Sequence, residues 1–403
     1  MSTATGKVGI WIIGARGGLA TTLITGTHML ARGLADSTGL ITSTPEFAEL
    51  PLPHAKQFIF GGHDVRRTSL WDSASAIQLA THSFPDAALR AVRPALARSE
   101  RNVKPGVAIN CGPAVQALTE ERACLHGSPK TVFAKLRSDL KAFRRSQKLR
   151  RLVVVNAAST EPLLPEAPFR KSGSKLLQAI AANDRRLRAS ELYGAAAALE
   201  ADAIINFTPN EGMLSAAVRE LATEAGVVFM GNDGKTGETL VKSALAPMFR
   251  YRNLKVLSWL GYNLLGDRDG QVLANPAHRA SKIRNKDGIL QRILGYAPTS
   301  LVRIDYVPSL EDNKTAWDFV HFAGFLGHRM SLQFTWAGTD SILAAPLVLD
   351  MVRLAVLASD RGERGALEHL AVFFKAPVGV AEDDLHKQFH KLTDYVAAAT
   401  KRG

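Results

Sequence analysis

Short apolar segments alternate with helical sequence patterns from residue 7 to residue 230, and this alternation restricts the fold more than any other feature. The apolar segments are Lys7–Ile13, Leu40–Ser43, Val107–Asn110, Leu152–Val155, Ala203–Phe207 and Val227–Met230. Helical patterns lie between them, over about 21–32, 131–147 and 174–198. Strands that alternate with helices form parallel βαβ units, so we expect an α/β fold with a doubly wound, Rossmann-like sheet.

The pattern changes after residue 250. The segments 254–260, 301–307 and 330–336 alternate polar and apolar residues with a period of two. Such strands have one face in water, which favours an antiparallel sheet that buries its free face against another subunit, and we expect one helix near 314–323. The long apolar segment 341–357 and the shorter segment 365–374 have helical patterns and are expected to close the first domain.

Length and composition narrow the class of protein. A chain of 403 residues is too long for one compact core, which favours two domains. Cys111 and Cys124 cannot form a disulfide framework, and so few cysteines suit a reducing cytosol. The apolar run Val8–Ile13 is too short for a signal peptide, and we expect no run of transmembrane length. The sequence therefore predicts a cytoplasmic globular protein with no membrane partner.

The net charge of +13 raises the question of an anionic partner. Part of the excess lies in the segment 144–151, RRSQKLRR, which contains no aromatic residue on which bases could stack. We interpret this segment as the solvated end of a helix before a strand, and we expect no nucleic-acid binding.

A glycine-rich turn follows the first strand. The residues Gly14-Ala-Arg-Gly-Gly-Leu-Ala20 lie between the strand and a helical pattern, the context that a dinucleotide fingerprint requires. Arg16 stands at the position of the second glycine, so the motif alone is weak, and a structural turn would explain it equally well. No carboxylate ends the segment Leu40–Ser43, which leaves Asp64 as the candidate to bind a ribose.

A second glycine-rich segment, GNDGKTG at 231–237, also lies between a strand and a helical pattern. Glycines free backbone N–H groups to face an anion, and the start of the helix adds partial positive charge, so the segment suits a phosphate. The alternative is a plain strand-to-helix turn with Thr236 as N-cap. Lys282 and Lys286 lie four residues apart, and two like charges on one helix face favour an anion between them.

Together these segments resemble the myo-inositol-phosphate synthase family, in its short archaeal and bacterial form. The resemblance covers nearly the whole chain and rests on GGHD, NCG, NAASTEP, NFTP, GNDGKTGETLVKSALAPMF, YNLLGDRDG, SKIRNK, DNKTAWDFVHFAGFLG, DSILAAPLVLD and FFKAP. It implies bound NAD, a homotetramer, and a role in inositol and phospholipid biosynthesis. It also implies a discontinuous NAD-binding domain over 1–235 and 341–403, with a catalytic and oligomerisation α+β domain over 236–340.

The resemblance assigns site residues by position. The active-site lysines match Lys282, Lys286, Lys314 and Lys375, and the polar catalytic residues match Asp233, Asp269, Asp340 and Asn263. The substrate-binding residues match Thr236, Gly237, Asp267 and, again, Lys286. The cofactor-binding residues match Gly14, Ala15, Arg16, Gly17, Gly18, Leu19, Asp64, Asn110, Ala157, Ser159, Thr160 and Asp233.

Four positions depart from the family pattern. Arg16 and Ala20 replace glycines, and Ser43 stands where close relatives carry an acid, so a preference for NAD over NADP rests on Asp64. Asn285 replaces a serine, and Glu211 adds a charge near the expected site.

The implied activity is a redox-neutral isomerisation. The family oxidises C5 of D-glucose 6-phosphate with NAD, closes the ring by an intramolecular aldol step, and reduces C5 again. Oxyanions develop in each step, and ammonium groups in a closed pocket stabilise them. Asp233, Asp269 and a phosphate would also suit a hard divalent or monovalent cation. Two alternatives remain: a sugar-phosphate dehydrogenase without cyclisation, and a non-catalytic NAD-sensing protein on the same fold.

Overall fold

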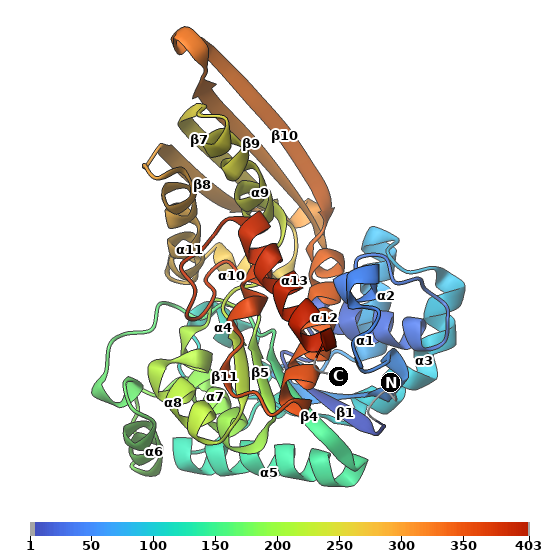
Figure 1. Ribbon diagram of the computed structural model, residues 1–403. Coiled ribbons are helices and arrows are strands. Elements are labelled where there is room, and N and C mark those ends of the chain that lie inside the picture. The colour runs from blue at the N-terminus through green and yellow to red at the C-terminus, as the bar shows by residue number, and fades with distance from the viewer. Residues whose placement is uncertain (1–4, 402–403) are drawn as a thin grey trace.

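The computed structural model describes residues 5–401, with the side chains of 280–287 excepted. Two sheets organise the chain, one at the bottom and one at the top of Figure 1. The lower sheet has seven parallel strands in the order β11-β6-β5-β4-β1-β2-β3. These strands are β1 (Lys7–Ile13), β2 (Phe58–Asp64), β3 (Val103–Pro105), β4 (Leu149–Asn156), β5 (Ala203–Asn206), β6 (Val228–Gly231) and β11 (Gly365–Ala366).

Helices cover both faces of this sheet because its strands are apolar on both sides. Ile10 and Ile12 of β1 belong to a core shared with α1 and α12, whereas Trp11 and Ile13 pack in a core shared with α5 and α7. Side chains of successive strand residues point to opposite faces, so a continuous apolar run supplies both cores. The helices of this part are α1 (Gly18–Ala31), α2 (Leu70–Thr81), α3 (Asp86–Glu100), α4 (Pro113–Ala117), α5 (Pro129–Gln147), α6 (Gly173–Ala181), α7 (Ala189–Glu200), α8 (Ala216–Glu224), α12 (Asp340–Asp360) and α13 (Leu385–Lys401).

The strand order reverses between β4 and β1. From β1 the chain moves outward through β2 and β3, and it then returns to build β4, β5 and β6 on the other side. In such sheets, ligands bind in the crevice beyond the carboxyl ends of the strands at this switch point.

The upper sheet has four strands in the order β10-β9-β7-β8. Its elements are β7 (Lys255–Leu265), β8 (Thr299–Tyr306), β9 (Asn313–Ala323) and β10 (Arg329–Thr339), with α9 (Gly237–Tyr251), α10 (Arg268–Leu273) and α11 (Pro276–Leu294) beside it. The strands β7 and β8 are parallel, and the other two pairs are antiparallel. In Figure 1, β9 and β10 form a long hairpin that projects away from the lower sheet.

The structure confirms the expected doubly wound sheet and four of its six predicted strands, but it corrects several local predictions. The segment Leu40–Ser43 is not a strand, since Ile41–Ser43 forms a 3₁₀ helix. The segment Val107–Asn110 is not a strand either, and the edge strand lies earlier, at β3. The single helix expected over 174–198 is two helices, α6 and α7.

The second half also differs from expectation. The helix expected near 314–323 is strand β9, because its aromatic and branched residues alternate in burial and pair with β7 and β10 on either side. The upper sheet is mixed rather than wholly antiparallel. The segment 365–374 contains the two-residue strand β11 and the 3₁₀ helix Glu368–Phe373, rather than an α-helix.

Helix α12 is long and apolar enough to cross a membrane by length and composition. The expectation that no run reaches transmembrane length was therefore wrong. However, 72% of its most apolar window is buried inside the structure. Val348, Val352 and Ala355 of this helix pack in the core that covers one face of the lower sheet. We therefore interpret α12 as a core helix.

Candidate active site

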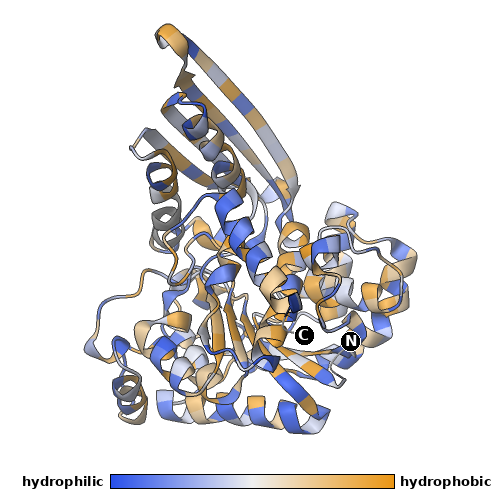
Figure 2. Cartoon of the chain, viewed as in Figure 1, coloured by the Kyte–Doolittle hydropathy of each residue, from blue (hydrophilic) through white to orange (hydrophobic). Residues whose placement is uncertain are grey.

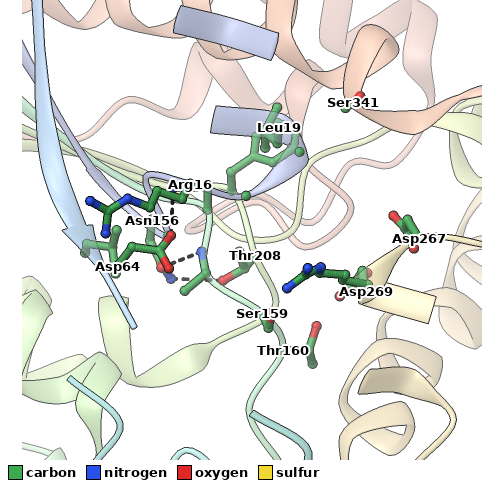
Figure 3. A pocket seen from close by; sticks show the side chains of 18 of the residues that line it. Arg16, Leu19, Asp64, Asn156, Ser159, Thr160, Thr208, Asp267, Asp269 and Ser341 are labelled. Carbon is green, nitrogen blue, oxygen red and sulfur yellow. Dashed lines mark hydrogen bonds between the residues drawn. The ribbon is translucent and has the colours of Figure 1, made fainter. Parts of the chain in front are cut away.

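A cavity of about 620 Å³ opens at the carboxyl ends of the parallel strands, at the switch point of the sheet. Its wall is built from the turn after β1, the ends of β2, β4 and β5, the segment 233–236, the start of α10, and the start of α12. Figure 3 shows side chains from these elements converging on one space. Of the predicted residues, those that line the cavity are Gly14, Arg16, Gly17, Gly18, Leu19, Asp64, Ala157, Ser159, Thr160, Asp233, Thr236, Asp267, Asp269, Asp340 and Lys375.

The glycine turn after β1 approaches the neighbouring backbone closely. Gly14 has a φ of +84°, and a Cβ added there would lie 3.0 Å from the carbonyl oxygen of Ala157. The N–H of Gly14 donates to the carbonyl of His63, and Ala15 is fully buried beneath the turn. Helix α1 begins at Gly18 after an N-cap glycine that offers no side-chain cap. Its first amides are therefore available to an anion in the cavity.

Asp64, at the end of β2, is buried and held by the same turn. One carboxylate oxygen accepts from the backbone N–H of Arg16 at 2.7 Å, and the other accepts from the N–H of Arg66 at 2.9 Å. The Arg16 side chain pairs with Glu100 and donates to the carbonyl of Arg66. The turn therefore accepts an arginine at a glycine position, since the long side chain is bound along the wall of the cavity.

Amide side chains connect the ends of β4 and β5. The amide of Asn156 donates to Asn206 and to the hydroxyl of Thr208, both at 2.9 Å. Figure 3 places Asn156 and Thr208 together near Ser159 and Thr160. This network fixes the backbone of the 156–160 segment where it faces the cavity.

Asp233 and Lys375 form the driest ion pair on the cavity wall. The Lys375 ammonium donates to one Asp233 oxygen at 2.9 Å, and the two side chains are 7% and 4% exposed. The second oxygen of Asp233 is buried and has no hydrogen-bond partner among the described residues. The pair thus places a carboxylate and an ammonium group together at the cavity wall.

Thr236 and Lys314 converge on Asp340 from two different elements. The Thr236 hydroxyl lies 3.3 Å from an Asp340 oxygen, and the Lys314 ammonium lies 3.5 Å from the same oxygen. A Cβ on Gly237, which does not line the cavity, would lie only 3.1 Å from that ammonium. The absence of a side chain at Gly237 therefore lets Lys314, which comes from β9, approach the start of α9.

Asn263 lies beneath the cavity wall rather than on it. Its amide donates to Glu238, which in turn forms a buried ion pair with Lys242, both 1% exposed. The side-chain oxygen of Asn263 has no hydrogen-bond partner among the described residues. Asn263 therefore belongs to a buried polar network behind the site.

The remaining predicted residues lie on α10, on α11, or away from the cavity wall. Asp267 caps α10 by accepting from the N–H of Gly270 at 2.8 Å, and Figure 3 shows Asp267 and Asp269 on the α10 side of the cavity, away from Asp64. Asn110 does not line the cavity, and its amide donates to the carbonyls of Arg185 and Leu187. Lys282 and Lys286 lie on α11, but their side chains fall outside the described residues.

Of the departures from the family pattern, Arg16 lines the cavity, whereas two others lie away from it. Glu211 and Ser43 do not line it, and the Ser43 hydroxyl lies 3.5 Å from the guanidinium of Arg353. Asn285 falls among the residues whose side chains are outside the described part.

The sequence reasoning did not select several charged residues on the wall: Arg66, Glu161, Arg268 and Asp312. Burial raises the pKa of Glu161 to about 7, although Ser190 donates two hydrogen bonds to its carboxylate. Burial also raises the pKa of Asp312, which accepts from the hydroxyl of Ser341. The available signal was position, since Arg66 and Arg268 stand beside selected acids in GGHDVRR and GDRDG.

Comparison with known proteins agrees with this geometry and with the resemblance seen in the sequence. A family model described as myo-inositol-1-phosphate synthase matches residues 8–397. The inositol-3-phosphate synthase 1 of Bacteroides thetaiotaomicron is 30% identical over 96% of this chain and 93% of its own length.

Solved structures have the same fold. The inositol-3-phosphate synthase of Caenorhabditis elegans superposes with a TM-score of 0.87 at 23% identity, over 99% of this chain and 86% of its own. A myo-inositol-1-phosphate synthase-related protein from Thermotoga maritima gives 0.78 at 25% identity, over 97% and 98% of the two chains. Because the family model spans almost the whole sequence, the chain belongs to the myo-inositol-1-phosphate synthase family.

Proposed function

We propose that this protein is an NAD-dependent inositol-3-phosphate synthase that converts D-glucose 6-phosphate to a myo-inositol phosphate. The observation that carries the proposal is the dry Lys375–Asp233 pair, which lies on the wall of the same cavity as the glycine turn. A dinucleotide site and an ammonium–carboxylate site in one cavity suit a reaction that both uses a cofactor and stabilises oxyanions.

The residues present fit NAD. Gly14 has no room for a side chain, the start of α1 has no side-chain cap, and Asp64 lies beside the turn. When bound, NAD would supply the hydride acceptor for the oxidation at C5 and the hydride donor for the reduction after ring closure. The chain would bind the cofactor through Gly14, Ala15, Arg16, Gly17, Gly18, Leu19, Asp64, Ala157, Ser159, Thr160 and Asp233, as the family pattern assigns them.

The remaining residues act on the substrate. Lys314 and Lys375 polarise the C1 and C5 oxygens, and their partners Asp340 and Asp233 hold them in place. Lys282 takes and returns the C5 hydroxyl proton, while Lys286 and Thr236 bind the phosphate. Asn263 supports the wall through Glu238, and Asp267 and Asp269 border the sugar from α10.

One assay tests this function. The protein is incubated with glucose 6-phosphate and NAD, the product is identified by NMR, and absorbance follows NADH. We expect an inositol phosphate with no accumulated NADH, since one bound cofactor is oxidised and reduced in each cycle. Stoichiometric NADH and an open-chain ketone would instead identify a dehydrogenase. Cofactor binding without turnover would identify a non-catalytic NAD-binding protein.

The upper sheet supports a homotetramer. Phe325 and Leu326, at the tip of the β9–β10 hairpin, are 88% and 89% exposed. Trp317, Leu301 and Met330 add partly exposed apolar surface to the same sheet. Apolar surface of this kind is typical of a subunit interface. Light scattering should give the mass of four chains, and a monomer at micromolar concentration would contradict this assignment.

The division into two units and the cytoplasmic location belong to the same proposal. Residues 1–235 and 341–403 contain the parallel sheet, and 236–340 contain the mixed sheet with α9, α10 and α11. A cation between Asp233 and Asp269 would need the substrate phosphate as a further ligand, because the described residues contain no group of three metal-binding side chains. Calorimetry should therefore detect Mg²⁺ binding only when glucose 6-phosphate is present.

A further inference from the structure

Lys235 is the residue of the segment 233–236 that is buried behind the cavity wall. Asp233, Gly234 and Thr236 line the cavity, whereas Lys235 does not line it and is only 2% exposed. A fully buried lysine is rare unless a partner binds its ammonium group, because burial removes the water that would otherwise solvate the charge. The partner of Lys235 therefore matters for the segment that carries it.

Helix α13 supplies that partner. The Lys235 ammonium donates to the side-chain oxygen of Gln388, which lies in the first turn of α13 and is 1% exposed. The side-chain nitrogen of Gln388 donates to the carbonyl of Glu382, and a carbonyl can only accept. This contact fixes the orientation of the amide, so its oxygen faces Lys235. Burial lowers the pKa of the Lys235 ammonium to about 8, although Asp383 and Asp384 attract it through space.

The residues just before α13 are also bound to the helix that follows the segment 233–236. That helix is α9, which begins directly after the segment and ends at Tyr251. The Tyr251 hydroxyl donates to Asp384, which is 3% exposed. The C-terminal segment 382–388 therefore contacts both the segment 233–236 and the far end of the helix that continues it.

The segment 233–236 needs contacts from outside, because Asp233 has a φ of +62°. This left-handed conformation is uncommon for residues other than glycine and persists where the surrounding structure holds it. Part of that restraint comes from the backbone. The N–H of Asp233 donates to the carbonyl of Thr208 at 3.1 Å. The N–H of Lys235 donates to the carbonyl of Phe373 at 2.8 Å. The bond from Lys235 to Gln388 adds a side-chain contact behind the wall.

We propose that Lys235 is a positioning residue whose bond to Gln388 holds the segment 233–236 in place. Held in this way, the segment presents the side chains of Asp233 and Thr236 to the cavity, where both take part in the polar contacts of the wall. Helix α13 thus contributes to the site although none of its residues lines the cavity. The inference rests on the proposed function only where kcat is measured.

Four variants test the inference. Lys235→Met and Gln388→Met each remove one partner of the bond and keep most of the side-chain volume, and the third variant combines them. The control is Val396→Ala, which shortens another buried side chain of α13 that takes no part in this bond. Activity is measured as inositol phosphate formation at saturating substrate, well below the unfolding temperature of each variant. Amide hydrogen exchange over residues 233–236 measures the segment directly and needs no substrate.

We expect both single variants to lower kcat roughly 10- to 100-fold, since a misplacement of about 1 Å has effects of this size. Exchange over 233–236 should become faster in both, and the control should match the wild type in kcat and in this exchange. The double variant separates positioning from stability. Gln388→Met alone leaves a buried ammonium without its acceptor, whereas the double variant removes both polar partners and should unfold at a higher temperature. Its kcat should nevertheless stay as low as that of Lys235→Met, because both substitutions act through one bond.

Several results would overturn the inference. These are unchanged exchange over 233–236 in both single variants, a wild-type kcat despite faster exchange, a kcat that recovers with stability in the double variant, or equal losses in Val396→Ala. A recovery of kcat would indicate that the bond only stabilises the fold. If exchange becomes faster as expected but even the wild type forms no inositol phosphate, the inference stands and the proposed function fails. If the wild type forms the product and exchange is the same in every variant, the inference fails alone.

Discussion

The two sheets differ in how their strands are buried, and the difference follows from their sequence patterns. Strands β5 and β6 of the parallel sheet are buried at every residue, whereas β8 and β10 of the mixed sheet alternate between exposed and more buried residues. Figure 2 shows the difference as largely orange strands in the lower sheet and alternating colours along the hairpin above. The strand ends of the parallel sheet line the cavity, whereas the mixed sheet leaves many residues of β8 and β10 exposed.

The two regions also differ in where their buried polar and charged groups lie. In the parallel region, the polar groups of the site lie at strand ends and face the cavity, as Asp64 and Asn156 do. In the mixed region, polar groups are buried within the packing, as in the Glu238–Lys242 pair and the bond from Trp259 to Asp318. Substitutions in the first region should therefore affect ligands, and substitutions in the second should affect stability.

The largest expected effect separates two predicted active-site lysines, Lys375 on the cavity wall and Lys314 on β9. Lys375 pairs with Asp233 at 2.9 Å in a dry environment, whereas Lys314 pairs with Asp340 at 3.5 Å with side chains that are 16% and 29% exposed. We expect Lys375→Met to lower kcat roughly 10²- to 10⁴-fold, the range for a lost proton-transfer or charge-stabilising group. Lys314→Met should cost less, because water can partly replace a more exposed ammonium group.

The measurement is inositol phosphate formation at saturating substrate, with thermal unfolding to show that each variant is folded. Lys387→Met is the matched control, since Lys387 forms an exposed pair with Glu382 away from the cavity. A larger loss for Lys314→Met than for Lys375→Met would reverse the expected ranking of the two lysines.

The second effect concerns stability in the mixed region. Lys242 and Glu238 form an ion pair in which both side chains are 1% exposed. Removing one partner leaves a buried charge without its counter-ion, so Lys242→Met should lower the free energy of unfolding by about 3–5 kcal/mol. The double variant Lys242→Met with Glu238→Gln should recover part of that loss. Denaturant unfolding measures both, and a single variant as stable as the wild type would show that the pair contributes little.

The sequence located the parallel strands because two-sided burial produces continuous apolar runs, which need no knowledge of distant residues. It failed where distant contacts decide the structure. The backbone of Ile41 and Thr42 donates to Asp350, more than 300 positions away, and this contact holds a 3₁₀ turn where a strand was expected. Strand β9 is fixed by its pairing with β7 and β10, which a local helical pattern does not reveal.

The sequence also predicted only part of the candidate site. Motifs identified 15 of the residues that line the cavity, including Asp233, Thr236 and Lys375. They could not show that Asn263 lies behind the wall, nor that Gly237 makes room for Lys314. They also missed Arg66 and Arg268, because the sequence does not show that these neighbours of Asp64 and Asp269 line the cavity as well.

The third effect tests Glu161, a buried acid on the cavity wall whose carboxylate accepts two hydrogen bonds from Ser190. Burial raises the pKa of Glu161 to about 7 from 4.5. The folded protein therefore holds the proton more tightly than the unfolded chain, and this stabilisation is complete below pH 4.5 and lost as the pH rises to 7. The fall should approach about 3 kcal/mol in the free energy of unfolding.

The free energy of unfolding is measured for the wild type and for Glu161→Gln at several pH values. The difference between the two isolates the contribution of Glu161, because the other titrating groups contribute equally to both proteins. The stability of the wild type relative to the variant should decline between pH 4.5 and 7. The exposed residue Glu224 provides the control, and Glu224→Gln should show no such decline. A difference that rises with pH would mean that Glu161 is stabilised as a carboxylate.

The smallest expected effects are changes in stability when one glycine in each sheet is replaced by alanine. A Cβ on Gly62 of β2 would lie 2.1 Å from the carbonyl oxygen of Ile12 in the adjacent strand, so backbone must move to admit it. A Cβ on Gly338 of β10 would meet only the Trp336 side chain, at 3.7 Å. We expect Gly62→Ala to cost about 1–3 kcal/mol of stability, in the range for overpacking, and Gly338→Ala to change it by less than about 0.5 kcal/mol. Thermal unfolding of both variants measures the contrast. Equal losses would mean that the free face of the mixed sheet is packed as tightly as the parallel sheet, as it would be if Gly338 were buried against another subunit.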